Sequence, residues 1–166
     1  MSKTIDNLKT AFAGESQANR KYLAFAKKAE ADGFPQIGKL FRAAAHAETI
    51  HAINHFKAMG GVKSTAENIQ EGIAGENYEV VSMYPPMLAE AEATGEKQAA
   101  RSFKYAVEAE KTHEAMYREA AETFATGKDL PEGDYYVCPV CGYTHAGPMT
   151  EKCPVCNLPA DKFDKI

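Results

Sequence analysis

Four long amphipathic segments carry acidic residues at positions where a hydrophobic residue is expected. In the first segment Glu15 interrupts an apolar stripe that includes Phe12 and Tyr22, so its carboxylate falls on the face that should be buried. Polar residues interrupt the other three segments in the same way. The complete set is Glu15, Glu48, His51, Glu76, Glu79, Glu110 and His113. Burying an unpaired carboxylate is costly, so a core lined with several of them requires neutralising cations.

The spacing of these residues predicts how cations would be held. Glu48-x-x-His51 and Glu110-x-x-His113 are i, i+3 pairs, which place a carboxylate and an imidazole on the same helix face. Single glutamates from two helices together with Glu-x-x-His from two others form the ligand pattern of a two-metal four-helix bundle. The sequence therefore predicts an all-α four-helix bundle with two metal ions. Mixed carboxylate and imidazole ligands suit iron or manganese, and the residues alone do not separate the two.

The segments are separated by residues that end helices. These breakers are Gly33 to Pro35, Gly60 and Gly61, Thr94 and Gly95, and Gly127 to Pro131. The third segment opens with Ser64 and Glu67, which form a capping-box pattern. Pro85 and Pro86 within it predict a kink, because proline lacks a backbone donor and clashes with the preceding turn.

Two cysteine pairs form a second predicted metal site. They are Cys138-x-x-Cys141 and Cys153-x-x-Cys156, and two such pairs bring four thiolates to one tetrahedral ion. Chemistry alone leaves zinc and iron equally open, because a structural zinc ribbon would also stabilise so short a segment. The aromatic residues that flank the pairs and are expected to cover the sulfurs are Tyr135, Tyr136, Tyr143 and Phe163.

Composition excludes several classes of protein. The chain has 166 residues and a net charge of −4, and its basic residues are scattered, which argues against nucleic acid as a partner. No apolar run is long enough to cross a membrane, and the first residues lack the apolar core of a signal peptide. We expect a cytoplasmic protein with no membrane partner, in which clustered cysteines bind metal rather than form disulfides.

The order and spacing of these motifs resemble the rubrerythrin family over essentially the whole chain. The matching motifs are Glu15, Glu48-x-x-His51, Glu76-x-x-Glu79, Met83-Tyr84-Pro85, Glu110-x-x-His113 and the two Cys-x-x-Cys pairs. The resemblance implies a ferritin-like di-iron bundle over residues 1–133 and a rubredoxin-like domain with one Fe(Cys)4 site over residues 134–166. It also implies a peroxidase that reduces hydrogen peroxide to water, and it favours iron over zinc at the cysteines.

The resemblance also implies roles for individual residues. Glu48 and Glu110 would bridge the two irons, Glu15 would complete one iron, and Glu76 with His113 would complete the other. His51 and Glu79 would exchange as ligands of the first iron on oxidation, since imidazole suits ferrous iron and carboxylate suits ferric iron. The alternative is that one of these two residues only supports the ligands. Tyr22 and Tyr84 would orient ligand carboxylates, or else serve only as core aromatic residues.

Expectations about partners follow partly from the sequence motifs and partly from the resemblance. No G-x-G-x-x-G motif for a nicotinamide or flavin is present, so an external reductase or electron carrier must supply the electrons. A homodimer or larger homo-oligomer is expected, in which the cysteine site of one subunit lies near the di-iron site of another. Two other functions stay open: a ferroxidase or iron-handling protein, and a non-catalytic scaffold protein with a zinc ribbon.

Overall fold

The computed structural model describes residues 2–166 and divides the chain into two compact units. The first unit is Met1–Lys63 and the second is Ser64–Ile166. The first contains only helices, whereas the second combines helices with a small three-stranded sheet. Each unit carries part of the predicted ligand set, so each is described by itself.

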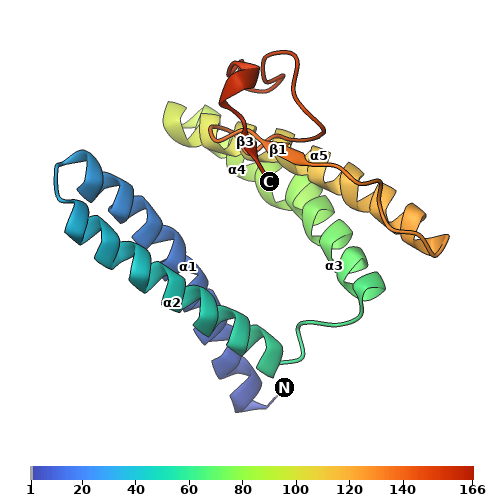
Figure 1. The fold of residues 1–166 in the computed structure, drawn as a ribbon, viewed down its shortest axis with the longest axis horizontal. Coiled ribbons are helices and arrows are strands. Elements are labelled where there is room, and N and C mark those ends of the chain that lie inside the picture. Colours follow the sequence, from blue (N-terminus) through green and yellow to red (C-terminus); the bar gives the residue numbers. More distant parts are fainter. Residues whose placement is uncertain (1) are drawn as a thin grey trace. The chain divides into compact units, whose positions relative to one another are not determined.

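The first unit is a hairpin of two long helices, α1 (Lys3–Ala31) and α2 (Pro35–Ala58), which lie side by side in Figure 1. Ser2 caps α1 by accepting a hydrogen bond from the backbone N–H of Ile5, and Pro35 occupies the first turn of α2, where its missing N–H has no cost. Gly33 has φ +87° in the turn between the helices, a conformation that favours glycine. The predicted helix break at this position is confirmed.

A buried polar contact and aromatic pairs hold the hairpin together. Asn19 is 6% exposed, and its Nδ2 donates to the Ala45 carbonyl at 2.6 Å and to the Thr49 hydroxyl at 2.7 Å. Phe12 and Phe56 stack with their ring centroids 5.1 Å apart. Because the Asn19 amide bonds both to a backbone carbonyl and to a side chain of α2, it fixes the register of α1 against α2.

The second unit begins with a helix that changes its winding part-way along. The α-helix α3 (Thr65–Tyr78) leads into a π-helical turn, η1 (Glu79–Met83), which continues as α4 (Tyr84–Ala93). Ser64 and Glu67 form the predicted capping box, with both reciprocal bonds present. The prolines after Tyr84 occupy the first turn of α4, and the winding changes to a π-helical turn just before them. The kink itself stays a prediction.

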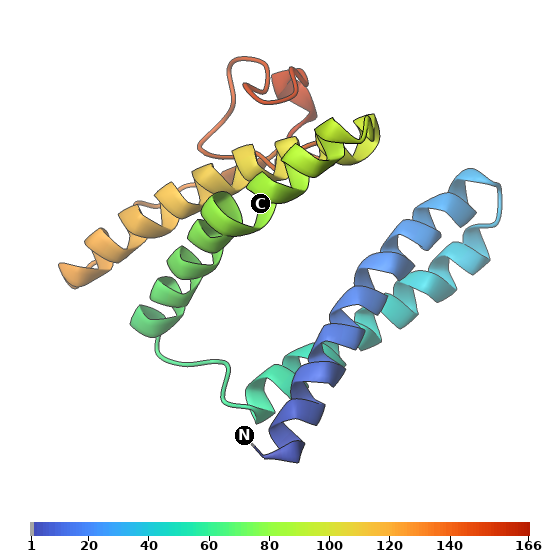
Figure 2. The same cartoon turned by 180° about the vertical axis from the view of Figure 1, so that it is seen from behind.

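The helix α5 (Lys97–Ala125) packs against α3, η1 and α4 within this unit. Figure 2 shows α3 and α4 following one another along α5 from the reverse side. The most buried residues of α5 include Val107 and Ala109, which are 8% and 2% exposed. The small side chain of Ala109 permits close approach of the segment that follows α5.

That segment forms a small antiparallel sheet in the strand order β2-β1-β3. Its strands are β1 (Tyr135–Val137), β2 (Thr144–Ala146) and β3 (Asp164–Lys165), with a short 3-10 helix, η2 (Ala160–Lys162), before the last strand. Val137 pairs with Thr144 in β2 and with Asp164 in β3. The buried cluster beside the sheet is made of Cys138, Cys141 and Cys153 rather than of aliphatic residues.

The expected fold class is confirmed: a helical protein with a small cysteine-bearing strand region at its C-terminal end. Within residues 2–166, no helix combines the length and the apolar character needed to cross a lipid bilayer.

Candidate metal centres

The hairpin of the first unit gathers three of the predicted ligands. Glu15 of α1 and Glu48 and His51 of α2 each offer a ligand atom, and these atoms lie within 4.8 Å of one another. The Nδ1 of His51 lies 2.9 Å from a Glu48 carboxylate oxygen and 3.9 Å from a Glu15 oxygen. The i, i+3 spacing thus brings carboxylate and imidazole together, as predicted. We call this group the hairpin cluster.

The second unit gathers three more. Glu76 of α3 and Glu110 and His113 of α5 also offer ligand atoms within 4.8 Å of one another, and we call this group the α5 cluster. The Nδ1 of His113 lies 2.5 Å from Glu110 and 4.0 Å from Glu76. The three side chains are 18% to 28% exposed, so all are half-buried. The two clusters have the same composition, two carboxylates and one imidazole.

The pKa values in the α5 cluster indicate that its carboxyl groups would be stabilised by a positive charge. Burial, repulsion from Glu110 and a hydrogen bond with Glu110 raise the pKa of Glu76 to about 7. The hydrogen bond with His113 lowers the pKa of Glu110, and the same bond raises the pKa of His113 against the effect of burial. Without a cation, Glu76 and Glu110 therefore do not both ionise readily, and Glu76 tends to keep its proton. A divalent cation would replace that proton.

Glu79 and Tyr84 lie beside the α5 cluster without belonging to the group of three. Glu79 opens the π-helical turn η1, a feature often found at functional sites. Burial raises its pKa first, and the charge of Glu110 raises it further. Burial also raises the pKa of Tyr84, with contributions from Glu79, Glu110 and Glu76. The charges of the α5 cluster therefore affect the pKa values of both side chains, and the hydroxyl of Tyr84 keeps its proton at neutral pH.

Tyr22 lies in an aromatic group of the first unit. Its ring centroid is 6.1 Å from that of Phe41 and 6.3 Å from that of Phe25. It is half-buried on α1, where its ring contacts these two phenylalanines. The predicted role of its hydroxyl toward a ligand carboxylate stays a prediction.

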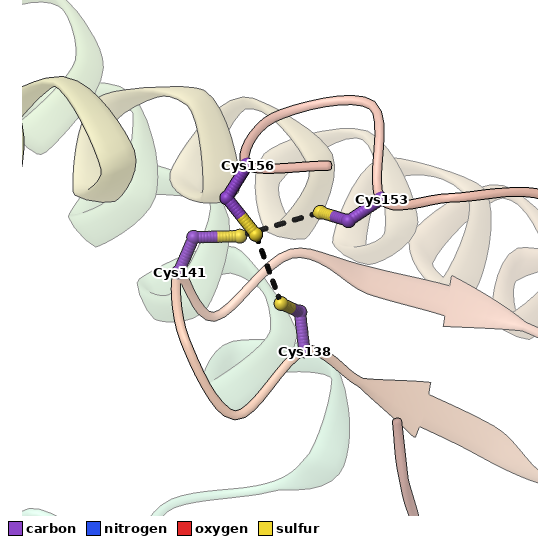
Figure 3. A group of neighbouring side chains, drawn as sticks. All are labelled: Cys138, Cys141, Cys153 and Cys156. Carbon is purple, nitrogen blue, oxygen red and sulfur yellow. Dashed lines mark hydrogen bonds between the residues drawn. The ribbon is translucent and has the colours of Figure 1, made fainter. Parts of the chain in front are cut away.

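The four cysteines converge at one point in the second unit. Figure 3 shows their sulfur atoms pointing toward one another, with dashed lines for the pairs Cys138–Cys156 and Cys141–Cys153, each 3.5 Å apart. All four are free thiols rather than disulfides. Cys138 and Cys153 are 1% and 0% exposed. A cluster of four converging thiols, three of them buried and none in a disulfide, is typical of a metal site.

The backbone on either side of the cysteines repeats the same loop twice. Gly142 N–H donates to the Cys138 carbonyl and Asn157 N–H donates to the Cys153 carbonyl, both at 2.9 Å. Gly142 and Asn157 have positive φ values of +81° and +63°, which turn each loop back so that both of its sulfurs face inward. The two Cys-x-x-Cys pairs are therefore equivalent knuckles, as their spacing predicted.

The cysteine cluster fits a tetrahedral metal ion. Metal–sulfur bonds of about 2.3 Å at tetrahedral angles would separate the sulfurs by about 3.8 Å, close to the observed 3.5 Å within the pairs. Burial raises the pKa of Cys141 and of Cys156. At Cys153 burial acts the same way, but backbone N–H groups of Cys156 and Val155 bring its pKa below the usual value. Neutral buried thiols would lose their protons to a bound cation.

Aromatic and aliphatic side chains cover the sulfurs. Tyr143 and Phe163 pack against the cluster as predicted, together with Tyr105, Val155 and Leu158, whereas Tyr135 and Tyr136 are not among the residues packed there. Tyr105 comes from α5, more than thirty residues before Cys138. Nothing in its sequence position signalled this contact, because it depends on how the sheet packs on α5.

The first knuckle lies against the α5 cluster of the same chain. Cys141 and Gly142 line a cavity of about 650 Å³ together with Glu110 and His113. The Nε2 of His113 lies 2.8 Å from the Thr144 hydroxyl, which itself donates to the Gly142 carbonyl at 3.1 Å. Sequence reasoning missed Thr144, because a threonine in a short strand carries no ligand signal of its own.

Comparison with known proteins places these features in a family. The family model described as Rubrerythrin matches residues 6–121, and the model for the rubredoxin-like domain of rubrerythrin matches residues 136–164. The chain belongs to the rubrerythrin family. It is similar to Rubrerythrin-2 of Clostridium acetobutylicum, with 40% identity over 96% of this chain and 95% of that protein. Nigerythrin of Nitratidesulfovibrio vulgaris is 36% identical over 98% of this chain and 86% of its own length.

Solved structures of rubrerythrin-family proteins agree. Nigerythrin in a mixed-valence state matches with a TM-score of 0.58 and 35% identity, and covers 100% of this chain and 88% of that one. Its fully reduced, all-ferrous state matches with a TM-score of 0.59 and 34% identity over the same shares. These matches and the clusters identify the ligand sets as those of a di-iron site and of a rubredoxin-type iron. Membership of the rubrerythrin family supports an oxidoreductase that serves in oxidative-stress protection.

Proposed function

We propose that this rubrerythrin-family protein is a peroxidase that reduces hydrogen peroxide to water with electrons passed from the cysteine-bound iron to the di-iron site. The reaction consumes one peroxide, two protons and two electrons and yields two waters. In this scheme residues 1–133 hold the di-iron site and residues 134–166 carry the electron relay. One observation supports the relay most directly: Cys141 and His113 line the same cavity in the second unit.

The ligands proposed for the two irons are those that the sequence predicted. The hairpin cluster supplies Glu15, Glu48 and His51, and the α5 cluster supplies Glu76, Glu110 and His113. When bound, two irons would supply both electrons of the reduction, so that no radical product would be released. Equal donor sets of two carboxylates and one imidazole suit a pair of like ions.

Protein groups beside the α5 cluster are suited to orienting ligands and substrate. Tyr84 stays protonated because burial and three nearby carboxylates raise its pKa, and its hydroxyl can donate a hydrogen bond to an oxygen atom beside it. Glu79 is proposed to alternate with His51 as a ligand, and Tyr22 to orient a carboxylate of the hairpin cluster.

The proposed function also requires an electron donor, a suitable compartment and an assembly. The electrons come from an external reductase or electron carrier, since the chain has no nucleotide-binding motif. The four free thiols suit a reducing compartment such as the cytoplasm. A homodimer or larger assembly is proposed from the resemblance described above.

A rapid-mixing experiment tests the peroxidase reaction. The iron-loaded protein is reduced without oxygen and mixed with stoichiometric hydrogen peroxide, while the visible absorption of the ferric thiolate site is followed. Fast return of the colour, faster than with O₂, is the expected result, because electrons then leave the cysteine iron for the peroxide reaction. Return only with O₂ would instead support a ferroxidase. A protein that binds zinc at the cysteines when iron is in excess would support the scaffold function.

A further inference from the structure

The hydroxyl of Thr144 joins the cysteine-bearing sheet to the α5 cluster. Thr144 begins strand β2, and its Oγ1 lies 2.8 Å from His113 Nε2 on α5. The same Oγ1 lies 3.1 Å from the Gly142 carbonyl oxygen. Thr144 is half-buried, so water competes only partly for these bonds. A side chain outside the predicted ligand set therefore contacts a predicted ligand directly.

The two bonds define which atom donates in each. A carbonyl oxygen only accepts, so the single hydroxyl hydrogen of Thr144 is directed to Gly142. The lone pairs of Oγ1 are then free to accept a hydrogen from His113 Nε2. A neutral imidazole carries one N–H, so a His113 that binds a metal through Nδ1 would keep its hydrogen on Nε2, where Thr144 accepts it.

The other ring nitrogen of His113 faces the carboxylates. His113 Nδ1 lies 2.5 Å from Glu110 and 4.0 Å from Glu76, and it belongs to the group of atoms that lie within 4.8 Å of one another. We propose that Thr144 is a positioning residue: it holds His113 with Nε2–H toward the cysteine-bearing sheet and Nδ1 toward the metal position. This inference rests on the proposed role of His113 as an iron ligand.

His51 lacks this support. Its Nδ1 also faces a carboxylate, that of Glu48 at 2.9 Å, and its side chain is 53% exposed. Within residues 2–63, the described part of its own unit, no protein group hydrogen-bonds its Nε2. Each imidazole is thus held differently by its own unit: His113 is fixed from both sides, whereas His51 is fixed from one side only. A fixed His113 fits a permanent ligand, and a freer His51 fits a ligand that exchanges.

The arrangement makes the α5 cluster depend on the docking of the sheet. Gly142 also lies close to α5, since a Cβ added there would be 3.7 Å from the Cβ of Ala109. If the knuckle moved away from α5, Thr144 would leave His113, and the imidazole would lose its orientation. Docking of the cysteine-bearing sheet and binding of iron by the α5 cluster should therefore reinforce each other.

The test compares Thr144→Val with Thr144→Ser in the full chain. Valine keeps the shape of threonine and removes the hydroxyl, whereas serine keeps the hydroxyl. Thr150→Val is the matched control, because Thr150 is exposed in the same C-terminal segment. The affinity of the carboxylate sites for ferrous iron is measured anaerobically with the cysteine site loaded. We expect Thr144→Val to lower this affinity about tenfold, and the other two variants to match the parent protein.

A second measurement follows the His113 Nε2–H directly. In the zinc-substituted full chain the imidazole signals are sharp, and the exchange of this hydrogen with solvent is measured by NMR. We expect exchange to be slower at His113 than at His51 in the parent protein, and about tenfold faster in Thr144→Val, since one hydrogen bond is lost. Thr144→Ser keeps the slow exchange.

Either of two results would overturn the proposal. One is an unchanged His113 Nε2–H exchange rate in Thr144→Val, and the other is an equal loss of iron affinity in Thr150→Val. Neither measurement uses peroxide, so failure of the peroxidase reaction would leave this test intact. Conversely, a normal peroxide reaction in Thr144→Val with altered N–H exchange would support the positioning role and show that it does not limit turnover.

Discussion

The neighbouring carboxyl groups of Glu76 and Glu110 make the metal-free protein sensitive to pH. The pKa of Glu76 rises from its ordinary value of 4.5 to about 7, first because of burial and then because of Glu110. A folded-state pKa above the unfolded value means that the proton stabilises the folded protein. This stability is fully present below pH 4.5 and is lost as the pH rises through about 7.

The size of the effect follows from the pKa change. A rise of this extent corresponds to about 3 kcal/mol of folding free energy if the group were fully shielded. The Glu76 side chain is 21% exposed, and solvent screening reduces the effect to about 1–2 kcal/mol. The raised pKa values of Glu79 and His113 act in the same direction. The lowered pKa of Glu110 acts only below its ordinary value of 4.5 and leaves the range from pH 5 to 8 unaffected.

The test substitution is Glu76→Gln. A chelator first removes any metal bound by the carboxylates, while the cysteine site stays loaded. The free energy of unfolding is measured with denaturant at pH 5 and pH 8. We expect the parent protein to lose about 1–2 kcal/mol between these values and Glu76→Gln to lose clearly less, since the amide carries no charge. Glu90→Gln removes the same charge from an exposed position on α4, and should lose as much as the parent protein.

Metal loading gives an internal check. A divalent cation requires ionised carboxylates, so the loaded parent protein should not lose stability between pH 5 and pH 8. If Glu76→Gln lost stability as steeply as the parent protein without metal, ionisation of the buried Glu76 carboxyl group would not be the cause. The reasoning about the α5 cluster would then be refuted.

Two substitutions test other parts of the description. Glu79→Ala should lower peroxide turnover about tenfold or more and alter the absorption of the oxidised di-iron site, because a supporting or exchanging carboxylate is lost. Glu92→Ala, on the exposed surface, is the control. An unchanged rate and spectrum in Glu79→Ala would show the exchange hypothesis to be wrong. Asn19→Ala removes two buried hydrogen bonds between α1 and α2 and should lower the free energy of unfolding by about 1–3 kcal/mol. Thermal or denaturant unfolding measures this loss, with Asn7→Ala at an exposed position as the control. Equal stabilities for the two variants would contradict the role given to Asn19.

The ligand types and their local spacing could be predicted from the sequence. An i, i+3 pair such as Glu110 and His113 meets on one face of any helix, so its 2.5 Å contact needed no tertiary information. The same holds for the two knuckles, because each Cys-x-x-Cys loop closes on itself through its own backbone bonds. Helix boundaries marked by Gly33 or Ser64 are likewise local, since positive φ and side-chain caps act within a few residues.

The contacts between distant segments were decided only by the tertiary structure. The π-helical turn that begins at Glu79 was not predicted, because a proline alone signals a kink without specifying the winding before it. Tyr105 covers the cysteine cluster and Thr144 bonds to His113 only because the sheet packs on α5. Short-range rules give which residues can bind metal, whereas the packing of one element on another determines which uncharged neighbours hold those residues in place.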